Sequence, residues 1–299
     1  MKKEKISTLI LTASLFSNLF TTNVYANNLN SNLIGYNVNC KHHNHNHNKK
    51  LFHESMNCMY RQQASYKNSP NTIYQMTNKL AHQDVKQKMY SNGRFRNATE
   101  YEITQHLAIN PRANSEQLKY QFLRLDSFRN VNASKLSRFL ENKGVFRGHA
   151  EDFINAARMN NIDPIYLVSH AMLETGNGTS NLAKGNKMHG KTYYNFFGIN
   201  AFDASPLYGG VSLAQKEDWS SVSKAIYGGA RWISKNYIHS SRHTQRTIYE
   251  MRFDPLANDP WHIYATDLKW PDKISSIMSN ISSFYNSSSI FDYEVIKYR

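Results

Sequence analysis

Residues 163–180 read DPIYLVSHAMLETGNGTS, an apolar helical segment that ends in one carboxylate, Glu174, directly before a turn rich in Gly, Asn and Ser. Asp163 is a favourable N-cap, Pro164 suits the first helical position, and Gly176 supplies a stop. The negative end of the helix dipole and the apolar neighbours both disfavour an ionised carboxylate, so we expect Glu174 to keep its proton. Such an acid, facing a cleft, can protonate the leaving oxygen of a glycosidic bond. A surface glutamate that precedes a helix C-cap fits the local pattern equally well.

The N-terminus has the features of a targeting segment. A basic start with Lys2, Lys3 and Lys5 precedes a mainly apolar stretch over residues 6–20, and Val24-Tyr25-Ala26 resembles a small-residue cleavage site. We therefore interpret residues 1–26 as a signal peptide. If it is not cleaved, it would act as a membrane anchor, although about fifteen apolar residues are few for a spanning helix. Both alternatives predict export.

The chain is strongly basic, with 36 Lys and Arg against 22 Asp and Glu and a formal net charge of +14. Residues 1–26 hold three lysines and one glutamate, so the remainder still carries +12. A basic exported protein is expected to meet a polyanion, and export favours an anionic cell envelope over nucleic acid. Lysines that merely keep the protein soluble are the alternative.

Residues 27–96 are rich in Asn, His, Lys and Gln and show no sustained hydrophobic period, which predicts a low-complexity spacer with at most one short helix. Cys40 and Cys58 flank the tract KHHNHNHNKK at 41–50 and would close a small disulfide loop outside the cell. The alternation of His with Asn lacks the spacing of a tetrahedral zinc site. We therefore favour a solvated segment over an adventitious metal tract, and assign no metal and no cofactor.

Helical periodicity dominates residues 97–290, which we assign to one folded domain followed by a C-terminal tail over 291–299. The apolar stripes predict helices over residues 134–142, 151–160, 163–174, 222–237 and 271–284. The intervening stretch 185–219, rich in Gly and aromatic residues, is predicted to form loops and short extended pieces. The expected fold is mainly α, within the α+β class: a helical body with a small irregular or β lobe and a substrate cleft between them.

Seven motifs, taken in order, carry a resemblance to a known family. They are NASKL with KGV (132–136, 143–145), IYLVSH (165–170), LETGNGTS (173–180), YNFFGI (194–199), AIYGGA (225–230), YEMR (249–252) and YATD (264–267). From roughly residue 120 to residue 281, somewhat over half its length, the chain resembles the catalytic domain of autolysin-type endo-β-N-acetylglucosaminidases, the family-73 glycoside hydrolases. The resemblance implies a lysozyme-like fold that hydrolyses the β-1,4 bond on the reducing side of N-acetylglucosamine in peptidoglycan.

The resemblance also implies roles for individual residues. Glu174 matches the general acid, and Tyr264 matches a tyrosine near the scissile bond, whose hydroxyl could orient a reacting group or water. The cleft-lining aromatic loop is matched by Asn195, Phe196, Phe197 and Gly198. These assignments agree with the acid inferred above from the helix end alone.

The second catalytic group is left open by the residues. An oxocarbenium-like transition state needs, besides the acid, a second carboxylate, the acetamido group of the substrate or a positioned water. Asp203 is the first carboxylate after Glu174 and is our candidate, with Glu217 and Asp218 behind it. As Asp203 precedes Ser205-Pro206, it is explained equally well as a turn former.

Sugar rings present apolar C–H faces that stack on aromatic side chains, and the candidates for this role are Tyr193, Tyr194, Phe197, Trp219 and Tyr237. The chain departs from the family pattern at HTQR (243–246) and at NDPWH (258–262). These departures concern loop shape and the preferred length of the substrate.

Two rival functions remain. A lytic transglycosylase or muramidase uses a similar helical fold with one essential glutamate, whereas a noncatalytic wall-binding or adhesion protein would hold the envelope with its positive charge and the histidine tract. The expected partners are peptidoglycan glycan strands and, through charge, anionic wall polymers, with no nucleic acid. We expect a monomer that is secreted and associated with the cell wall.

Overall fold

The computed structural model describes residues 61–180, 183–200 and 206–299. Its α-helices are α2 (Ile73–Ala81), α3 (Glu100–Leu107), α4 (Asn110–Ala113), α5 (Ala133–Leu140), α6 (Ala150–Met159), α7 (Pro164–Glu174), α8 (Pro206–Lys216), α9 (Val222–Ile233), α10 (Ile248–Phe253) and α11 (Trp270–Asn280). Short helical turns are η1 (Lys119–Phe122), η2 (Gly144–Phe146), η3 (Ser234–Ile238) and η4 (Ser282–Phe284). The strands are β1 (Arg61–Asn68), β2 (Lys88–Ser91), β3 (Arg94–Asn97), β4 (Asn186–Met188), β5 (Lys191–Tyr193) and β6 (Ile290–Lys297).

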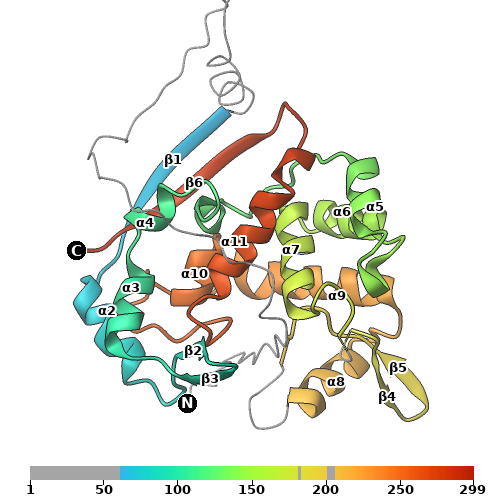
Figure 1. Cartoon of the computed structure of the whole chain (residues 1–299), viewed down its shortest axis with the longest axis horizontal. Helices are drawn as coiled ribbons and strands as arrows, with labels where there is room; N and C mark the ends of the chain where they lie inside the picture. The colour runs from blue at the N-terminus through green and yellow to red at the C-terminus, as the bar shows by residue number, and fades with distance from the viewer. Residues whose placement is uncertain (1–60, 181–182, 201–205) are drawn as a thin grey trace, which may run out of the picture.

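Helix α7 is the central element, packed between α6 and α11 (Figure 1). Its N-cap is Asp163, as the sequence predicts: the side chain accepts a 2.9 Å hydrogen bond from the Tyr166 amide. The same buried carboxylate accepts bonds from Arg129 (3.0 Å) and from the Tyr285 hydroxyl (2.8 Å). Every residue from 164 to 172 is buried, which explains why the helix is apolar on all faces.

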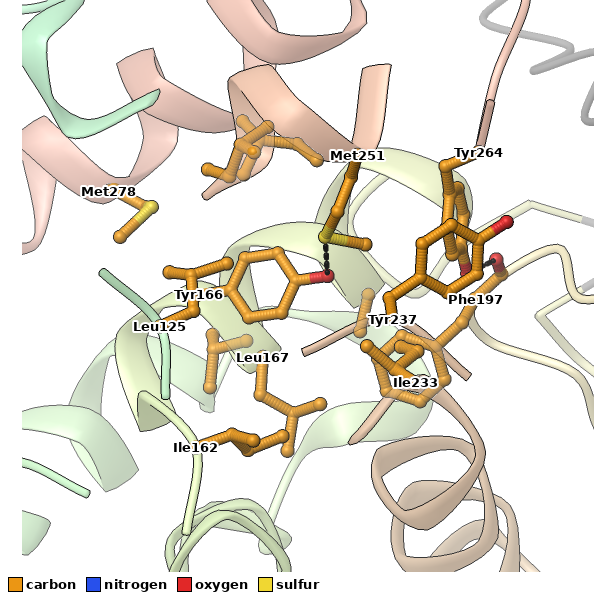
Figure 2. Packing of buried hydrophobic residues seen from close by; sticks show 14 of the residues in the cluster. Leu125, Ile162, Tyr166, Leu167, Phe197, Ile233, Tyr237, Met251, Tyr264 and Met278 are labelled. Carbon is orange, nitrogen blue, oxygen red and sulfur yellow. Dashed lines mark hydrogen bonds between the residues drawn. The ribbon is translucent and has the colours of Figure 1, made fainter. Parts of the chain in front are cut away.

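The hydrophobic core surrounds α7. Figure 2 shows Tyr166 in this core with Leu125 and Leu167, its hydroxyl 3.6 Å from the sulfur of Met251 on α10. Helices α5, α6, α9 and α11 lie within a few residues of the predicted segments, and the Ser221 side chain caps α9 by accepting from the Lys224 amide. These elements confirm the predicted mainly helical fold class.

The small lobe contains more regular structure than expected. The β4–β5 hairpin matches the short extended pieces predicted over 185–219, but α8 occupies the end of this stretch, where no helix was predicted. Two adjacent glycines, Gly209 and Gly210, have low helix propensity and interrupt the apolar periodicity by which a helix is recognised in the sequence. Val211 and Ala214 are nevertheless buried, so packing stabilises α8. In Figure 1, α8 and the β4–β5 hairpin form one corner of the molecule, beyond the lower end of α7.

The folded unit extends beyond the boundaries expected at residues 97 and 290. Strand β1 pairs in parallel with β6 from Arg61↔Ile290 to Asn68↔Lys297, so the spacer interpretation does not hold for residues 61–96 and residues 291–297 are not a tail. β6 contributes buried apolar side chains to the core, whereas β1 does not. Strand β1 is polar and is ordered because it pairs with β6. The spacer also contains α2, which begins with a Thr72–Gln75 capping box, and the β2–β3 hairpin.

The predicted signal peptide, the histidine tract, Cys40 and Cys58 lie outside the described residues. Within 61–180, 183–200 and 206–299, no helix is both long and apolar enough to span a membrane. In the same ranges, no group of three or more His, Cys, Asp or Glu side chains is placed to hold a metal ion.

Candidate active site

Glu174 closes α7 at the point where the N-terminus of α11 meets it. Its side chain is only 3% exposed, and the indole Nε1–H of Trp270, the first residue of α11, donates a 2.9 Å hydrogen bond to Oε1. In a neutral carboxyl group the carbonyl oxygen is a better acceptor than the hydroxyl oxygen. The indole bond therefore favours Oε1 of Glu174 as the carbonyl oxygen and Oε2 as the oxygen from which a proton is transferred.

A cage of rings fixes the position of Glu174. His170, one helical turn earlier and fully buried, places Nε2 3.6 Å from Glu174 Oε1, while its Nδ1 lies 3.1 Å from the Tyr166 hydroxyl. The imidazole meets the rings of Phe197, Tyr264 and Trp270 edge to face, at centroid distances of 5.4, 4.9 and 5.2 Å. A carboxylate held by packed rings in this way has few alternative rotamers, which is the preorganisation that an acid catalyst requires.

Tyr264 is part of this cage and fully buried. Its hydroxyl donates a 2.9 Å hydrogen bond to the backbone carbonyl of Phe197 (Figure 2), and its ring stacks on Trp270 at 5.1 Å. Burial raises the pKa of Tyr264 well above its ordinary value, so the phenol stays neutral. This hydroxyl was expected to orient a reacting group, whereas in the structure it is hydrogen-bonded to the loop that holds Phe197.

The loop over residues 194–199 is built by Asn195. The side-chain amide donates to the Ile199 carbonyl (2.7 Å) and accepts from the Ile199 amide (3.1 Å), which closes the loop around Gly198 with its positive φ of 61°. Phe196 and Phe197 point into the core and are fully buried. The expectation that these two rings line the cleft is therefore not met, because a buried ring has no face to offer a sugar.

The same correction applies to three other predicted sugar ligands. Trp219, Tyr237 and Tyr193 are 1%, 0% and 6% exposed. Tyr194, Asn195 and Gly198 are partly exposed, and Tyr194 is the predicted stacking residue whose ring keeps some contact with solvent. Residue type does not distinguish the two kinds of ring, but burial separates the packing residues from a smaller set that can touch a ligand.

Glycines allow segments from different sequence motifs to pack closely against one another. A Cβ on Gly228 of α9 would lie 1.9 Å from the Trp219 indole, and one on Gly229 would lie 2.2 Å from the Phe197 ring. The paired glycines of the AIYGGA motif thus let both rings press against α9. Gly144 and Gly178 likewise bring the KGV segment to the turn after Glu174, where the Val145 amide donates a 3.0 Å bond to the Gly178 carbonyl.

The candidates for the second carboxylate divide in two. Asp203 lies outside the described residues. Glu217 and Asp218 are placed on the surface, where Glu217 pairs with Arg231 (3.5 Å) and Asp218 with Lys224 (2.5 Å). Asp218 also has a positive φ of 52° and accepts from the Ser220 hydroxyl, so it serves as a turn residue.

Two members of the cage, His170 and Trp270, were not assigned a role by sequence reasoning. His170 precedes Glu174 by four residues and so lies on the same helix face. Trp270 precedes Pro271, which the sequence predicts to open a helix. The start of that helix fixes the backbone of Trp270 and so the direction of its indole. These two positions in the sequence could have marked His170 and Trp270 as candidates. Neither position alone shows that the side chain lies next to Glu174, which depends on the tertiary fold.

The two segments that depart from the family pattern meet beside this cage. The ring of His262 stacks on Tyr237 (4.2 Å, 10°), which in turn packs against Tyr264. Burial lowers the pKa of His262 to about 4, so the imidazole is neutral in the folded protein near pH 7.

We expect this histidine to make the protein less stable in acid. The unfolded chain binds the His262 proton below its ordinary pKa of 6.5, whereas the folded protein does not until about pH 4, so the contribution to stability is complete above pH 6.5 and is lost as pH falls to 4. The full shift corresponds to roughly 3 kcal/mol. Urea unfolding at pH 7 and pH 4.5 should show His262→Phe gaining about 2 kcal/mol relative to wild type at the lower pH. An equal difference at both pH values would contradict this assignment.

Known proteins similar to this chain include members of one family of glycosidases. The glucosaminidase family model, described as mannosyl-glycoprotein endo-beta-N-acetylglucosaminidase, matches residues 150–283. Beta-N-acetylglucosaminidase of Bacillus subtilis is 37% identical over 206 residues, which are 69% of this chain and 23% of that protein. The bifunctional autolysin of Staphylococcus aureus is 42% identical over 189 residues, 60% of this chain and 14% of that protein. The chain thus spans a quarter or less of the length of these relatives.

Solved structures agree. Autolysin E of S. aureus superposes with a TM-score of 0.65 and 34% identity, covering 76% of this chain and 97% of that one. A catalytic mutant of the same autolysin, solved in complex with the disaccharide NAG-NAM, gives a TM-score of 0.64 and 33% identity, with coverage of 76% and 98%. The chain belongs to the glucosaminidase family, and its fold is the one that the motifs led us to expect.

Proposed function

We propose that this protein is a peptidoglycan hydrolase, an endo-β-N-acetylglucosaminidase that cleaves the β-1,4 bond between N-acetylglucosamine and N-acetylmuramic acid during wall turnover or cell separation. The observation that carries the proposal is the single carboxyl group of Glu174, held at the end of α7 by the Trp270 indole and the His170 ring. Family membership and the neighbour solved with NAG-NAM support the choice of substrate.

In the proposed reaction, Oε2 of Glu174 donates its proton to the oxygen that leaves with the next sugar. Positive charge then develops at the anomeric carbon and needs a partner on the opposite face of the ring. A second carboxylate, the acetamido group of the substrate or a positioned water can serve. We keep Asp203 as the carboxylate candidate. Tyr264 and Trp270 act as positioning residues, since their contacts fix Glu174 and the 194–199 loop.

The test is to identify the new glycan ends. Purified protein is incubated with peptidoglycan, and the products are reduced with borohydride and analysed by mass spectrometry. Reduced N-acetylglucosamine ends are expected. Reduced muramic acid ends would instead identify a muramidase, and anhydromuramyl ends a lytic transglycosylase. Binding to peptidoglycan without any cleavage would favour a noncatalytic wall-binding protein.

The chain is further proposed to act outside the cell as a monomer, held at the wall by its positive charge. We expect binding to purified wall to weaken several-fold between about 0.05 and 0.5 M NaCl, because exposed charges are screened over shorter distances as salt rises. Sedimentation of the protein with wall fragments measures this. Retention that does not change with salt would show that contacts to sugar, not charge, hold the protein.

A further inference from the structure

The segments 243–246 and 258–262 lie on either side of α10 in the sequence and meet around one buried carboxylate. Asp254, the left-handed C-cap of α10, accepts the backbone N–H bonds of Trp261 (3.0 Å) and His262 (3.1 Å) on Oδ2. Its other oxygen, Oδ1, contacts Nε2 of His243 and accepts from Gln245 (3.1 Å). Asp254 is 1% exposed, so a single fixed group sets the position of both segments.

Together these segments present an aromatic surface. Trp261 is 44% exposed, which is unusual for the largest apolar side chain. His243 lies beside its ring at 5.3 Å, and His262 stacks beneath it at 4.9 Å with an interplanar angle of 30°. A flat indole supported from one side and open on the other is suited to the apolar C–H face of a pyranose ring.

The loop that carries Trp261 is held in place before any ligand binds. Side chains that flank α2 donate hydrogen bonds to the backbone of this loop: Asn71 to the carbonyl of Ala257 (2.9 Å), and Gln83 to that of Pro260. A surface fixed in this way loses little conformational entropy on binding.

A continuous series of ring contacts connects this surface to the acid. Trp261 stacks on His262, His262 on Tyr237 (4.2 Å), Tyr237 packs on Tyr264 (4.9 Å), and Tyr264 stacks on Trp270 (5.1 Å), whose indole bonds Glu174. Trp261 is thus four ring contacts from the residue that bonds to the acid. Because each of these four steps is only 4.2–5.1 Å between ring centroids, Trp261 lies close enough to Trp270 for a strand of several sugars bound at Glu174 to span the separation.

We propose that Trp261, with His243 beside it, is a distal subsite that stacks on a sugar ring of the same β-1,4-linked amino-sugar strand that is cleaved at Glu174. The inference rests on the proposed function and extends it to a preference for long glycan strands. The subsite belongs to the two segments in which this chain differs from its family pattern.

The test compares Trp261→Ala with Tyr101→Ala, which removes a 72% exposed ring on α3 that has no part in the series of contacts. Both are made in a Glu174→Gln background, and affinity is measured by calorimetry for soluble, peptide-free glycan strands and for the shortest oligosaccharide that wild type binds. Trp261→Ala should weaken long-strand binding roughly 2- to 12-fold, the range for one aromatic stacking contact. The short oligosaccharide and Tyr101→Ala should show no change, and Trp261→Phe should restore most of the affinity.

Kinetics of the same substitutions in the active enzyme provide a second reading. The KM for long strands should rise in Trp261→Ala by the factor lost in affinity, with kcat unchanged. Equal affinity of the Glu174→Gln protein for long strands with and without Trp261→Ala would overturn the subsite, and so would an equal loss for both substrate lengths. A wild-type protein that binds strands in a Trp261-dependent way but cleaves none would overturn the hydrolase proposal and leave the subsite standing.

Discussion

Replacing Glu174 with glutamine is expected to lower kcat on peptidoglycan by roughly 100- to 10,000-fold, the usual contribution of a positioned general acid. Glutamine keeps the length and planarity of the side chain, and its carbonyl oxygen can still accept the 2.9 Å bond from the Trp270 indole. What it lacks is a proton that can be transferred to the leaving oxygen. KM should change little, because the shape of the site is retained.

The measurement is the rate at which new reducing ends appear, with thermal unfolding of each variant as the control for folding. Glu217→Gln is the matched substitution, since Glu217 is a surface carboxylate that forms an ion pair with the exposed Arg231. It should retain wild-type activity. If Glu174→Gln kept more than about a tenth of kcat, the assignment of the acid would be wrong, because general acid catalysis contributes at least about a hundredfold.

The central helix and its acid could be predicted from sequence because the information is local. A cap, a proline at the first position, an apolar run and a glycine stop determine the eleven-residue helix α7. Strand β1 offered no such signal. Its sequence RQQASYKN is polar, and its partner β6 lies more than 200 residues further along the chain, so its order comes from pairing that a local pattern does not contain.

The aromatic residues of the site show a different limit. Residue type identifies rings that can stack on sugar, but it does not say which face of the fold they occupy. Trp219 and Phe197 proved to be buried against α9, and the paired glycines in that helix were the sequence feature that could have indicated it. The partners of Glu174 depend on the meeting of α7 with α11, which is a property of the tertiary fold.

The second large effect is expected at Arg252, which lies behind the site. This guanidinium is completely buried, and burial lowers its pKa to about 9. Nε donates to the carbonyl of Asp267 (2.8 Å), and Nη2 donates to the carbonyl of Thr266 (2.7 Å) and to Oε1 of Gln87 (2.8 Å). Arg252 thereby joins α10, the YATD loop that leads into α11, and the N-terminal segment before β2.

Arg252→Met should lower the free energy of unfolding by about 3–5 kcal/mol. Methionine fills much of the volume and removes the cost of burying the cation, but it loses three hydrogen bonds from a charged donor, at roughly 1.5–3 kcal/mol each. The carbonyls of Thr266 and Asp267 keep the amides of Lys88 and Trp270 as donors, so the loss comes from these charged bonds and from Oε1 of Gln87. Arg252→Lys should recover only part of this loss, because one ammonium group cannot reproduce a planar fork of donors. Urea denaturation is the measurement, and Arg231→Met, at a side chain that is 66% exposed, should stay within about 0.5 kcal/mol of wild type. A loss below about 1 kcal/mol in Arg252→Met would contradict this role and would show that the backbone amides and other contacts hold the loop before Trp270 without the guanidinium.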